Sequence, residues 1–232
     1  MRNIIILTLL AVLALTGCVR GSGVMTERED AVSGFKHVEV QGRGRLIITQ
    51  GETESLVVEA EDNIIGHIES RVAGDKLTIE HKRMLFVRPT QRVVYHLSVR
   101  DLESISAVGA VSVHGVTPIV ADSLALVVAG AGETELEVNV RSLDLMVAGA
   151  SDMTLSGAAE NFKAEVAGAG DMEAFDLITQ HAAIKAAGAT SVNITVEQTL
   201  AIEASGACDI SYRGDAQVIK QELSGSNSIS RK

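Results

Sequence analysis

Four acidic residues, Glu133, Asp152, Asp171 and Asp209, each stand three positions after a glycine in a phrase that recurs along the chain. If the repeats stack as β-strands, Glu133, Asp152 and Asp171 come from successive repeats, lie about 4.8 Å apart and repel one another unless something screens them. Calcium prefers such oxygen ligands, so one interpretation is a calcium-binding ladder. The other is that these side chains accept hydrogen bonds from turn amides. The turn interpretation is favoured, because calcium-binding β-roll repeats have a nonapeptide period with two glycines, unlike this phrase.

The phrase itself occurs seven times between residues 105 and 229, with separations of 21, 19, 19, 20, 18 and 19 residues between its glycines. These glycines are Gly109, Gly130, Gly149, Gly168, Gly188, Gly206 and Gly225. Apolar and polar positions alternate with period two on both sides of each glycine, which is typical of strands. A unit of this length cannot bury its apolar face alone, but stacked units can. We therefore predict an all-β fold, a right-handed parallel β-helix with coils of about 19 residues.

The N-terminus predicts export and a lipid anchor. A short basic start precedes the apolar run Ile4–Leu15, which is too short to span a membrane and fits a secretory signal. The run ends in Leu15-Thr16-Gly17-Cys18, which resembles the lipobox of bacterial lipoproteins. This resemblance implies cleavage after residue 17 and lipidation of Cys18. Val19, rather than Asp, follows the cysteine, a pattern that resembles sorting to the outer membrane.

Charge and cysteine content restrict the classes of partner. The formal net charge is −10, and removal of residues 1–17 takes away Arg2 and no acid, so the mature chain is near −11. Nucleic acid is therefore not an expected partner. Lipidation of Cys18 would leave Cys208 without a partner for an intramolecular disulfide, and we interpret Cys208 as a small structural thiol.

The sequence does not favour an enzyme. Coils of 18–21 residues leave no long loops to build a cleft, and His114 and His181 are isolated. No Lys-Ser or Lys-Thr follows the glycines, so phosphate-loop chemistry is not indicated. The chain has no Trp, two Tyr and four Phe, which provides poorly for sugar stacking. We predict no catalytic residues and no cofactor, with calcium at the acidic ladder as the one alternative.

The segment between the N-terminus and the repeats divides into a tether, residues 18–30, and a β region, residues 31–104, that is continuous with the repeats of residues 105–232. Strands are predicted at 37–40, 45–49, 55–60, 76–80 and 93–99, and one or two helical turns at 62–69. Residues 81–89 are basic at their ends and apolar within, so this stretch forms either a covered edge or an exposed contact site. In the last repeat Ser and Asn replace the alanines, which predicts a polar cap over the open edge.

The stretch SGFKHVEVQGRGRLIITQGETESLVVEAEDNIIGHIESRV, then GDKLTIE and the repeated VAGAG phrases, resembles the auto-transporter adhesin head (GIN) domain family. The resemblance runs from about Ala31 to the C-terminus, and its most specific part is residues 44–51 with residues 59–65. It implies a β-helix-like fold and surface exposure in bacterial envelope proteins, many of them lipoproteins. It supplies no catalytic or binding residues. The Arg83–Val87 stretch departs from the pattern.

We therefore expect a lipid-anchored protein of the bacterial cell envelope, sorted to the outer membrane, whose β-helix mediates adhesion or another intermolecular interaction. Its partners would be the membrane, through the N-terminal lipid, and an envelope protein, a glycan or a second copy of the chain. A structural spacer with its contact site at residues 81–92 is the alternative. A polysaccharide-active enzyme is the third and weakest.

Overall fold

A computed structural model describes residues 18–82 and 86–232, so the predicted signal peptide lies outside the described residues. The short 3-10 helix η1 (Ile65–His67) lies where helical turns were expected, and no α-helix occurs in the part of the chain described. The all-β prediction is confirmed. The strands are β1 (Cys18–Arg20), β2 (Met25–Asp30), β3 (His37–Gln50), β4 (Ser55–Glu61), β5 (Ile68–Ala73), β6 (Lys76–His81), β7 (Phe86–Arg88), β8 (Val94–Val99), β9 (Ser104–Gly115), β10 (Ile119–Arg213), β11 (Gln217–Gly225) and β12 (Ser228–Arg231).

Strand β3 joins the N-terminal region to the repeats. It bends at Gly42 and Gly44, whose φ angles of 117° and 144° suit glycine. Its first limb pairs in parallel with β6 and its second limb with β8. On its other edge, both limbs pair in parallel with β9, from His37 opposite Ser104 to Ile48 opposite Gly115. The bend of β3 is therefore repeated in β9.

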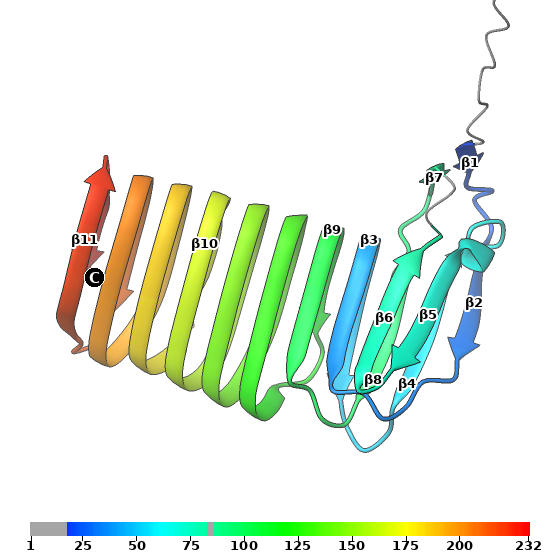
Figure 1. Ribbon diagram of the computed structural model, residues 1–232, viewed down its shortest axis with the longest axis horizontal. Coiled ribbons are helices and arrows are strands. Elements are labelled where there is room, and N and C mark those ends of the chain that lie inside the picture. The colour runs from blue at the N-terminus through cyan, green and yellow to red at the C-terminus, as the bar shows by residue number, and fades with distance from the viewer. Residues whose placement is uncertain (1–17, 83–85) are drawn as a thin grey trace, which may run out of the picture.

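The repeats continue this pairing. Gly109 of β9 lies opposite Gly130 of β10, and Gly206 of β10 lies opposite Gly225 of β11. Within β10, a Cβ built on Gly168 would lie 2.0 Å from the carbonyl oxygen of Gly149. In Figure 1 the ribbon from β3 to β11 is a row of bent strands side by side. Each corner glycine is thus needed for its positive φ and for the close approach of the preceding repeat.

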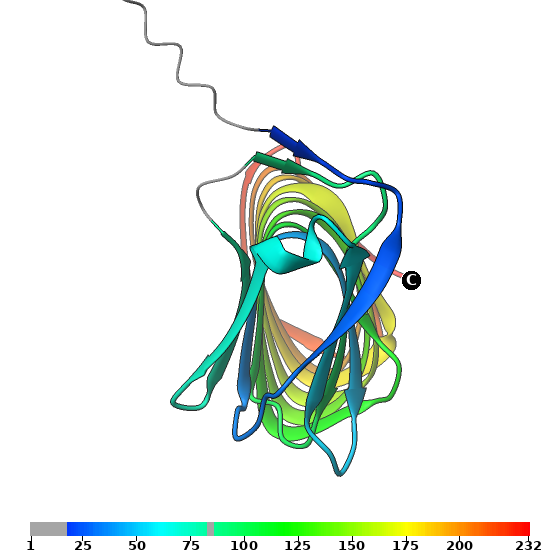
Figure 2. The same ribbon diagram turned by 90° about the vertical axis from the view of Figure 1, so that its right-hand side faces the viewer.

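The core lies between the two limbs of the repeats, which face each other in Figure 2. Two alternating positions, two residues before and four residues after the glycine, point inward in the first six repeats and are buried. They are filled mostly by Ala, Val, Met and Ile, as the period-two pattern predicted. Each buried Val, Ile or Met side chain contributes about 1.5–3 kcal/mol.

The sheet is mixed and open, so a purely parallel arrangement is wrong for the N-terminal region. Strand β4 pairs antiparallel with β8 and β2, and β5 pairs antiparallel with β6. For β5 and β6 the reason is local, since the two-residue turn Gly74-Asp75 reverses the chain between them. The expected tether, residues 18–30, contains β1 and β2.

The two ends of the row of repeats differ. At the N-terminal end, β5, β6, β8, β4 and β2 extend and cover the limbs of β3. At the C-terminal end, β11 pairs with β10 on one edge, and no described strand pairs with its other edge. The predicted polar cap is incomplete, because Ile219 and Leu223 of this strand are 60% and 43% exposed.

Candidate interaction surfaces

The four residues of the acidic ladder are exposed and lie on the outward side of the limb that follows the corner glycine. The Asp171 N–H donates to Oδ1 of Asp152 at 3.3 Å, and the Glu133 N–H donates to the Ser112 hydroxyl at 3.4 Å. These contacts join a side chain in one repeat to a backbone amide in the next. The turn interpretation predicted that these side chains accept hydrogen bonds from turn amides, whereas the Asp152 carboxylate accepts from the backbone of the neighbouring repeat.

The row that contains the ladder begins with a cation. Arg45 of β3 lies opposite Ser112 of β9, two repeats before Glu133. In the described ranges, no group of three or more His, Cys, Asp and Glu side chains is placed to hold a metal ion. The hydrogen bond between Asp171 and Asp152 links two neighbouring members of the ladder, and calcium binding there stays the alternative prediction.

A second outward row, five residues after the glycine, also links neighbouring repeats. His114 Nδ1 lies 3.0 Å from Glu135 Oε2, and Asn193 donates to Glu173 at 2.8 Å. Further along the row, the hydroxyl groups of Ser211 and Ser230 lie 3.0 Å apart. The exposed face after the corner is therefore a continuous polar surface with side chains ordered by contacts between repeats.

The opposite outward face, on the limb before the corner, mixes alanines with ion pairs and exposed apolar side chains. Lys163 pairs with Glu165 at 3.0 Å, and this hydrogen-bonded pair lowers the pKa of Glu165. Met146 is 51% exposed on the same limb of an earlier repeat. This face therefore presents small side chains between exposed charged and apolar ones.

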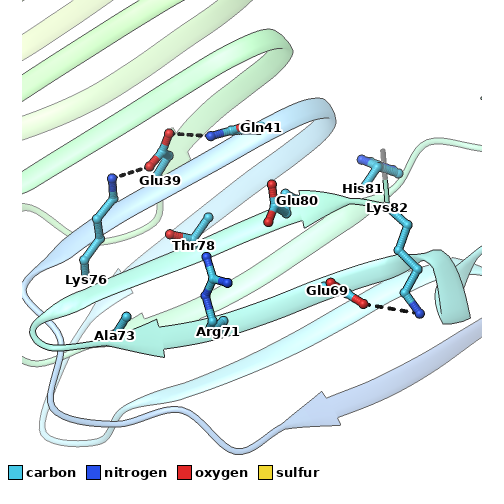
Figure 3. Close-up of a pocket in the computed structure, with 10 residues that line it drawn as sticks. All are labelled: Glu39, Gln41, Glu69, Arg71, Ala73, Lys76, Thr78, Glu80, His81 and Lys82. Atoms are coloured by element: carbon cyan, nitrogen blue, oxygen red, sulfur yellow. Dashed lines mark hydrogen bonds and ion pairs between the residues drawn. The ribbon is translucent and has the colours of Figure 1, made fainter. Parts of the chain in front are cut away.

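A charged groove of about 830 Å³ lies over β3, β5 and β6 (Figure 3). Its lining charges are largely paired, since Lys76 contacts Glu39 and Lys82 lies 3.3 Å from Glu69. Arg71 and Glu80 line the same groove. Sequence reasoning missed it, because the groove exists only where the β5–β6 hairpin pairs with β3.

His81 forms one end of this groove. Its Nε2 atom is buried and has no hydrogen-bond partner among the described residues. Burial lowers the pKa of His81, with a smaller contribution from nearby Arg43, although a backbone hydrogen bond at Gln41 opposes the shift. Burial therefore disfavours the charged form of the imidazole at this end of the groove.

Cys18 lies in β1, whose residues pair in parallel with β7, with Cys18 opposite Phe86. The segment that follows is held by the buried carboxylate of Glu61, which accepts hydrogen bonds from the Gly23 N–H at 2.7 Å and the Thr90 N–H at 2.8 Å. The Thr90 hydroxyl also donates to Glu61. A Cβ at Gly21 would lie 1.9 Å from this carboxylate, so the chain passes close to it.

Burial by itself would raise the pKa of Glu61. The hydrogen bonds from Thr90, and from the backbone of Gly23 and Gln91, outweigh burial and hold the pKa below its usual value. The ionised carboxylate of Glu61 thus links the N-terminal segment to the residues after β7. We call this set of hydrogen bonds the Glu61 clamp. The sequence held no signal for it, because all its donors lie at least 29 residues away.

Cys208 is buried, with Sγ 3.6 Å from the Ser205 carbonyl oxygen and 3.8 Å from that of Gly188. It lies two residues after a corner glycine, where Ser151 and Thr190 occupy the same buried position in other repeats. This placement agrees with a small structural thiol.

One further corner was missed in the sequence. Gly42 of β3 lies opposite Gly109, and a Cβ on Gly109 would lie 2.2 Å from the Gly42 carbonyl oxygen. Val40 and Leu46 take the inward positions of this first unit and are buried. The row therefore has eight corners, and the phrase Val40–Leu46, with its alternation about Gly42, was the available signal. The separation of 67 residues between Gly42 and Gly109, against 18–21 between the other corner glycines, concealed the relation.

The model of the family described as "Putative auto-transporter adhesin, head GIN domain" matches residues 34–216. None of the curated proteins has a sequence similar enough to match. Three crystal structures share the fold and are described as a putative adhesin from Bacteroides fragilis, a putative lipid binding protein from Parabacteroides distasonis and a putative adhesin from Parabacteroides merdae.

The Bacteroides fragilis structure has a TM-score of 0.82 at 20% identity, over 92% of this chain and 99% of that chain. The Parabacteroides distasonis structure has a TM-score of 0.74 at 20% identity, over 93% of this chain and 100% of that chain. The Parabacteroides merdae structure has a TM-score of 0.67 at 17% identity, over 92% of this chain and 98% of that chain. At these identities the structures show the fold alone. Since the family model covers more than half of the sequence, the chain belongs to the auto-transporter adhesin head (GIN) domain family.

Proposed function

We propose that this chain is a non-enzymatic, lipid-anchored protein of the bacterial cell envelope that acts in adhesion. The observation that carries the proposal is the in-register row of repeats, from β3 to β12, whose outward side chains form continuous rows. Such a surface offers many equivalent contacts along one direction, which suits binding to an extended partner or to another surface. Membership in a family described as adhesin heads agrees with this role.

We infer that the repeats form a right-handed β-helix, residues 105–232, continuous with residues 31–104. The parallel pairing at intervals of one repeat and the inward apolar positions support this arrangement. In this arrangement the open end at β11 and the covered end at β2 and β5 are the two ends of one rod.

The contacts of the exposed polar side chains favour binding over catalysis. Polar groups in the acidic ladder, the row from His114 and the charged groove contact one another or a backbone amide, as Asp152 contacts the Asp171 amide and Lys76 contacts Glu39. In a catalytic site, the polar side chains instead point toward one position, where the reacting atom of the substrate lies. Turnover of a polysaccharide by the purified chain would contradict the proposal.

The anchor would be Cys18, with the outer membrane as its site. Strand β1 lies at the covered end of the molecule, opposite the C-terminal repeat (Figure 1), so an anchored chain would extend its repeats away from its lipid. Among the described residues, no helix has the length and apolar character needed to cross a membrane.

The anchor is tested by expression of the full chain in bacteria with radiolabelled palmitate. We expect the wild-type chain to be labelled and to fractionate with the outer membrane, and the Cys18→Ser chain to be unlabelled. A Cys208→Ser chain is the matched control and should be labelled like the wild type. Labelling of the Cys18→Ser chain would rule out this anchor.

Adhesion is tested with residues 18–232 carrying Cys18→Ser. We expect this chain to bind an envelope protein or a glycan from fractionated envelope material, and charge reversal at Asp152 and Asp171 to weaken binding when the outward row is the contact. Reversal at Lys76, on the far side of the molecule, is the control. Equal binding by all variants would show that the outward row is not the adhesive surface.

A structural spacer is the second candidate, and the pairing of β1 with β7 favours it. This pairing brings residues 86–88 beside the anchor, where Arg20 and Arg88 are exposed. The contact site at residues 81–92 would then act at the membrane, and one structural neighbour is described as a lipid binding protein. Polar replacement of residues 84–87 should abolish partner capture if this segment, rather than the repeats, is the contact.

A further inference from the structure

The last repeat exposes side chains that the other repeats bury. Two residues before the corner glycine, Val128, Val147 and Val166 are at most 8% exposed, whereas Leu223 is 43% exposed. The difference arises because each earlier repeat has a neighbour on both sides, and the last has β10 on one side only. Ile219 of the same strand is 60% exposed. An apolar position that is built for the interior thus faces solvent at this end.

The outer edge of β11 carries backbone donors and acceptors that no described strand pairs with. Such edges are templates for pairing with another chain. Opposite β10, the strand is regular from Lys220 to Gly225, and Ile219 forms a bulge between Val218 and Lys220. A second strand can therefore pair along residues 220–225, and when two copies pair antiparallel about Gln221, residues 220–222 lie in the regular stretch of both.

The sequence of this edge is complementary to itself. Lys220 and Glu222 are two residues apart, so they lie on the same, outward face of the strand. If two copies of β11 pair antiparallel about Gln221, Lys220 of each copy lies opposite Glu222 of the other, twice in one interface. In the same register, the inward-facing Leu223 approaches the bulge of the second copy, where Val218 and Ile219 lie. Opposite charges on directly facing residues stabilise an antiparallel pair, and like charges destabilise it.

We propose that β11 is a homodimer interface, in which two copies of this chain join antiparallel through their C-terminal repeats about Gln221. The pairing is isologous, so the same surface is used on both copies and the assembly closes at two chains. The partner is a second copy rather than an unrelated protein, because the alternation of Lys220 and Glu222 matches itself in only this orientation.

The geometry has a consequence for adhesion. When two rods join at their β11 ends, their covered ends point in opposite directions, and so do the two β1 strands. Two chains anchored through Cys18 would therefore bridge two facing surfaces. This consequence rests on the proposed anchor, whereas the dimer itself does not.

The dimer is tested by sedimentation of residues 18–232 carrying Cys18→Ser. We expect the wild-type chain to dimerise, and Lys220→Glu and Glu222→Lys each to weaken dimerisation about tenfold, because each places like charges opposite one another twice. An equimolar mixture of the two variants should restore association as a heterodimer, since both facing pairs are then opposite in charge. This restoration also shows that both variants fold.

The matched control is Lys163→Glu, at the same position of an interior repeat, where Lys163 pairs with Glu165 as Lys220 does with Glu222. It should leave dimerisation unchanged. A wild-type chain that stays monomeric up to about 0.1 mM would overturn the proposal. So would a dimer that neither charge reversal weakens, or variants that fail to associate when mixed.

Bridging is tested with beads that carry the chain through its N-terminus. Beads with Lys220→Glu and beads with Glu222→Lys should each stay dispersed and should aggregate when mixed. Dispersal of the mixture, with heterodimers formed in solution, would exclude bridging between surfaces. Absence of palmitate labelling would contradict the lipid anchor but not the dimer. The failure of the anchor proposal is therefore distinguishable from the failure of the dimer proposal.

Discussion

The N-terminal region and the repeats both enclose an apolar core with bent sheets, but they do so with different structural elements. Residues 104–232 use one corner, a glycine with positive φ, and small or medium aliphatic side chains at fixed positions. Residues 18–103 use antiparallel hairpins, large buried side chains such as Phe35 and Tyr95, and the buried carboxylate of Glu61. The repeats use the same corner geometry many times, whereas the covered end of the row is stabilised by contacts that occur only once.

The charges of the two regions follow the same division. Residues 18–103 contain twelve Lys and Arg against fourteen acids, and residues 104–232 contain seven against sixteen. The acidic excess of the chain therefore lies on the repeats, where outward side chains are exposed and can stay solvated. The N-terminal region pairs its charges across neighbouring strands, as at Lys76 and Glu39.

The largest effect is expected from Gly168→Ala in the repeats. The new Cβ would lie 2.0 Å from the Gly149 carbonyl oxygen at a φ of 137°, so the backbone of two repeats must move. We expect a loss of about 3 kcal/mol or more in the free energy of unfolding, measured with denaturant. Gly51→Ala is the control, since nothing lies near its Cβ position, and it should change stability little. Equal effects would show that the corner is not the rigid element of the repeats.

Glu61→Gln probes the contacts that occur once in the N-terminal region. The amide cannot accept all the hydrogen bonds that the carboxylate takes from Gly23 and Thr90, so the melting temperature should fall by several degrees at pH 7. Exposed Glu137→Gln is the control and should leave it unchanged.

The same variant predicts a pH dependence. Because the pKa of Glu61 is lowered in the folded chain, its stabilisation is present above the ordinary Glu pKa of about 4.3 and is lost as the pH falls through the folded value. Wild-type and Glu61→Gln melting temperatures should therefore converge as the pH falls below about 4.3. A constant difference down to acid unfolding would contradict an ionised clamp.

A smaller effect of opposite sign is expected at Thr134. Its hydroxyl is buried without a partner among the described residues, at an inward position that other repeats fill with Val, Met or Ile. Thr134→Val should stabilise the chain by about 1 kcal/mol. Thr179→Val is the matched control, because that buried hydroxyl donates to the Thr195 carbonyl oxygen at 2.8 Å, and its loss should destabilise.

The smallest effect is expected from calcium. Asp152 already accepts the Asp171 amide, and the row lacks a described group of three ligands, so millimolar calcium should shift the melting temperature by less than about 2 °C. A larger rise that disappears in the Asp152→Asn, Asp171→Asn chain would restore the ladder as a metal site.

Much of the fold could be predicted because it depends on local sequence patterns, such as the alternation of apolar and polar residues. The alternation around Gly109 to Gly206 identified the inward positions, and strands at 55–60 and 76–80 were found as β4 and β6. Strand β5 was missed because its first two residues were assigned to the helical turns predicted at 62–69 and the others to no element. The antiparallel pairings of β4 with β2 and β8 were missed because they depend on which distant strands meet.

The functional features divide in the same way. Cys18 and the acidic ladder are visible in the sequence, because motif position and repeat register are local properties. The Glu61 clamp and the charged groove required the structure, since their members come from strands far apart in the chain.

The sequence alone determined that this chain would be built of stacked strand units with a glycine at each corner, because period-two burial and positive φ are decided by neighbouring residues. Only the tertiary structure decided how the row of units ends. At one end, antiparallel strands and a buried carboxylate cover the core, and at the other, β11 leaves Leu223 and an open edge to solvent. The physical reason is that exposure at an end depends on a missing neighbour, so the Ser and Asn residues of the last repeat predicted a polar cap but not the exposure of Leu223.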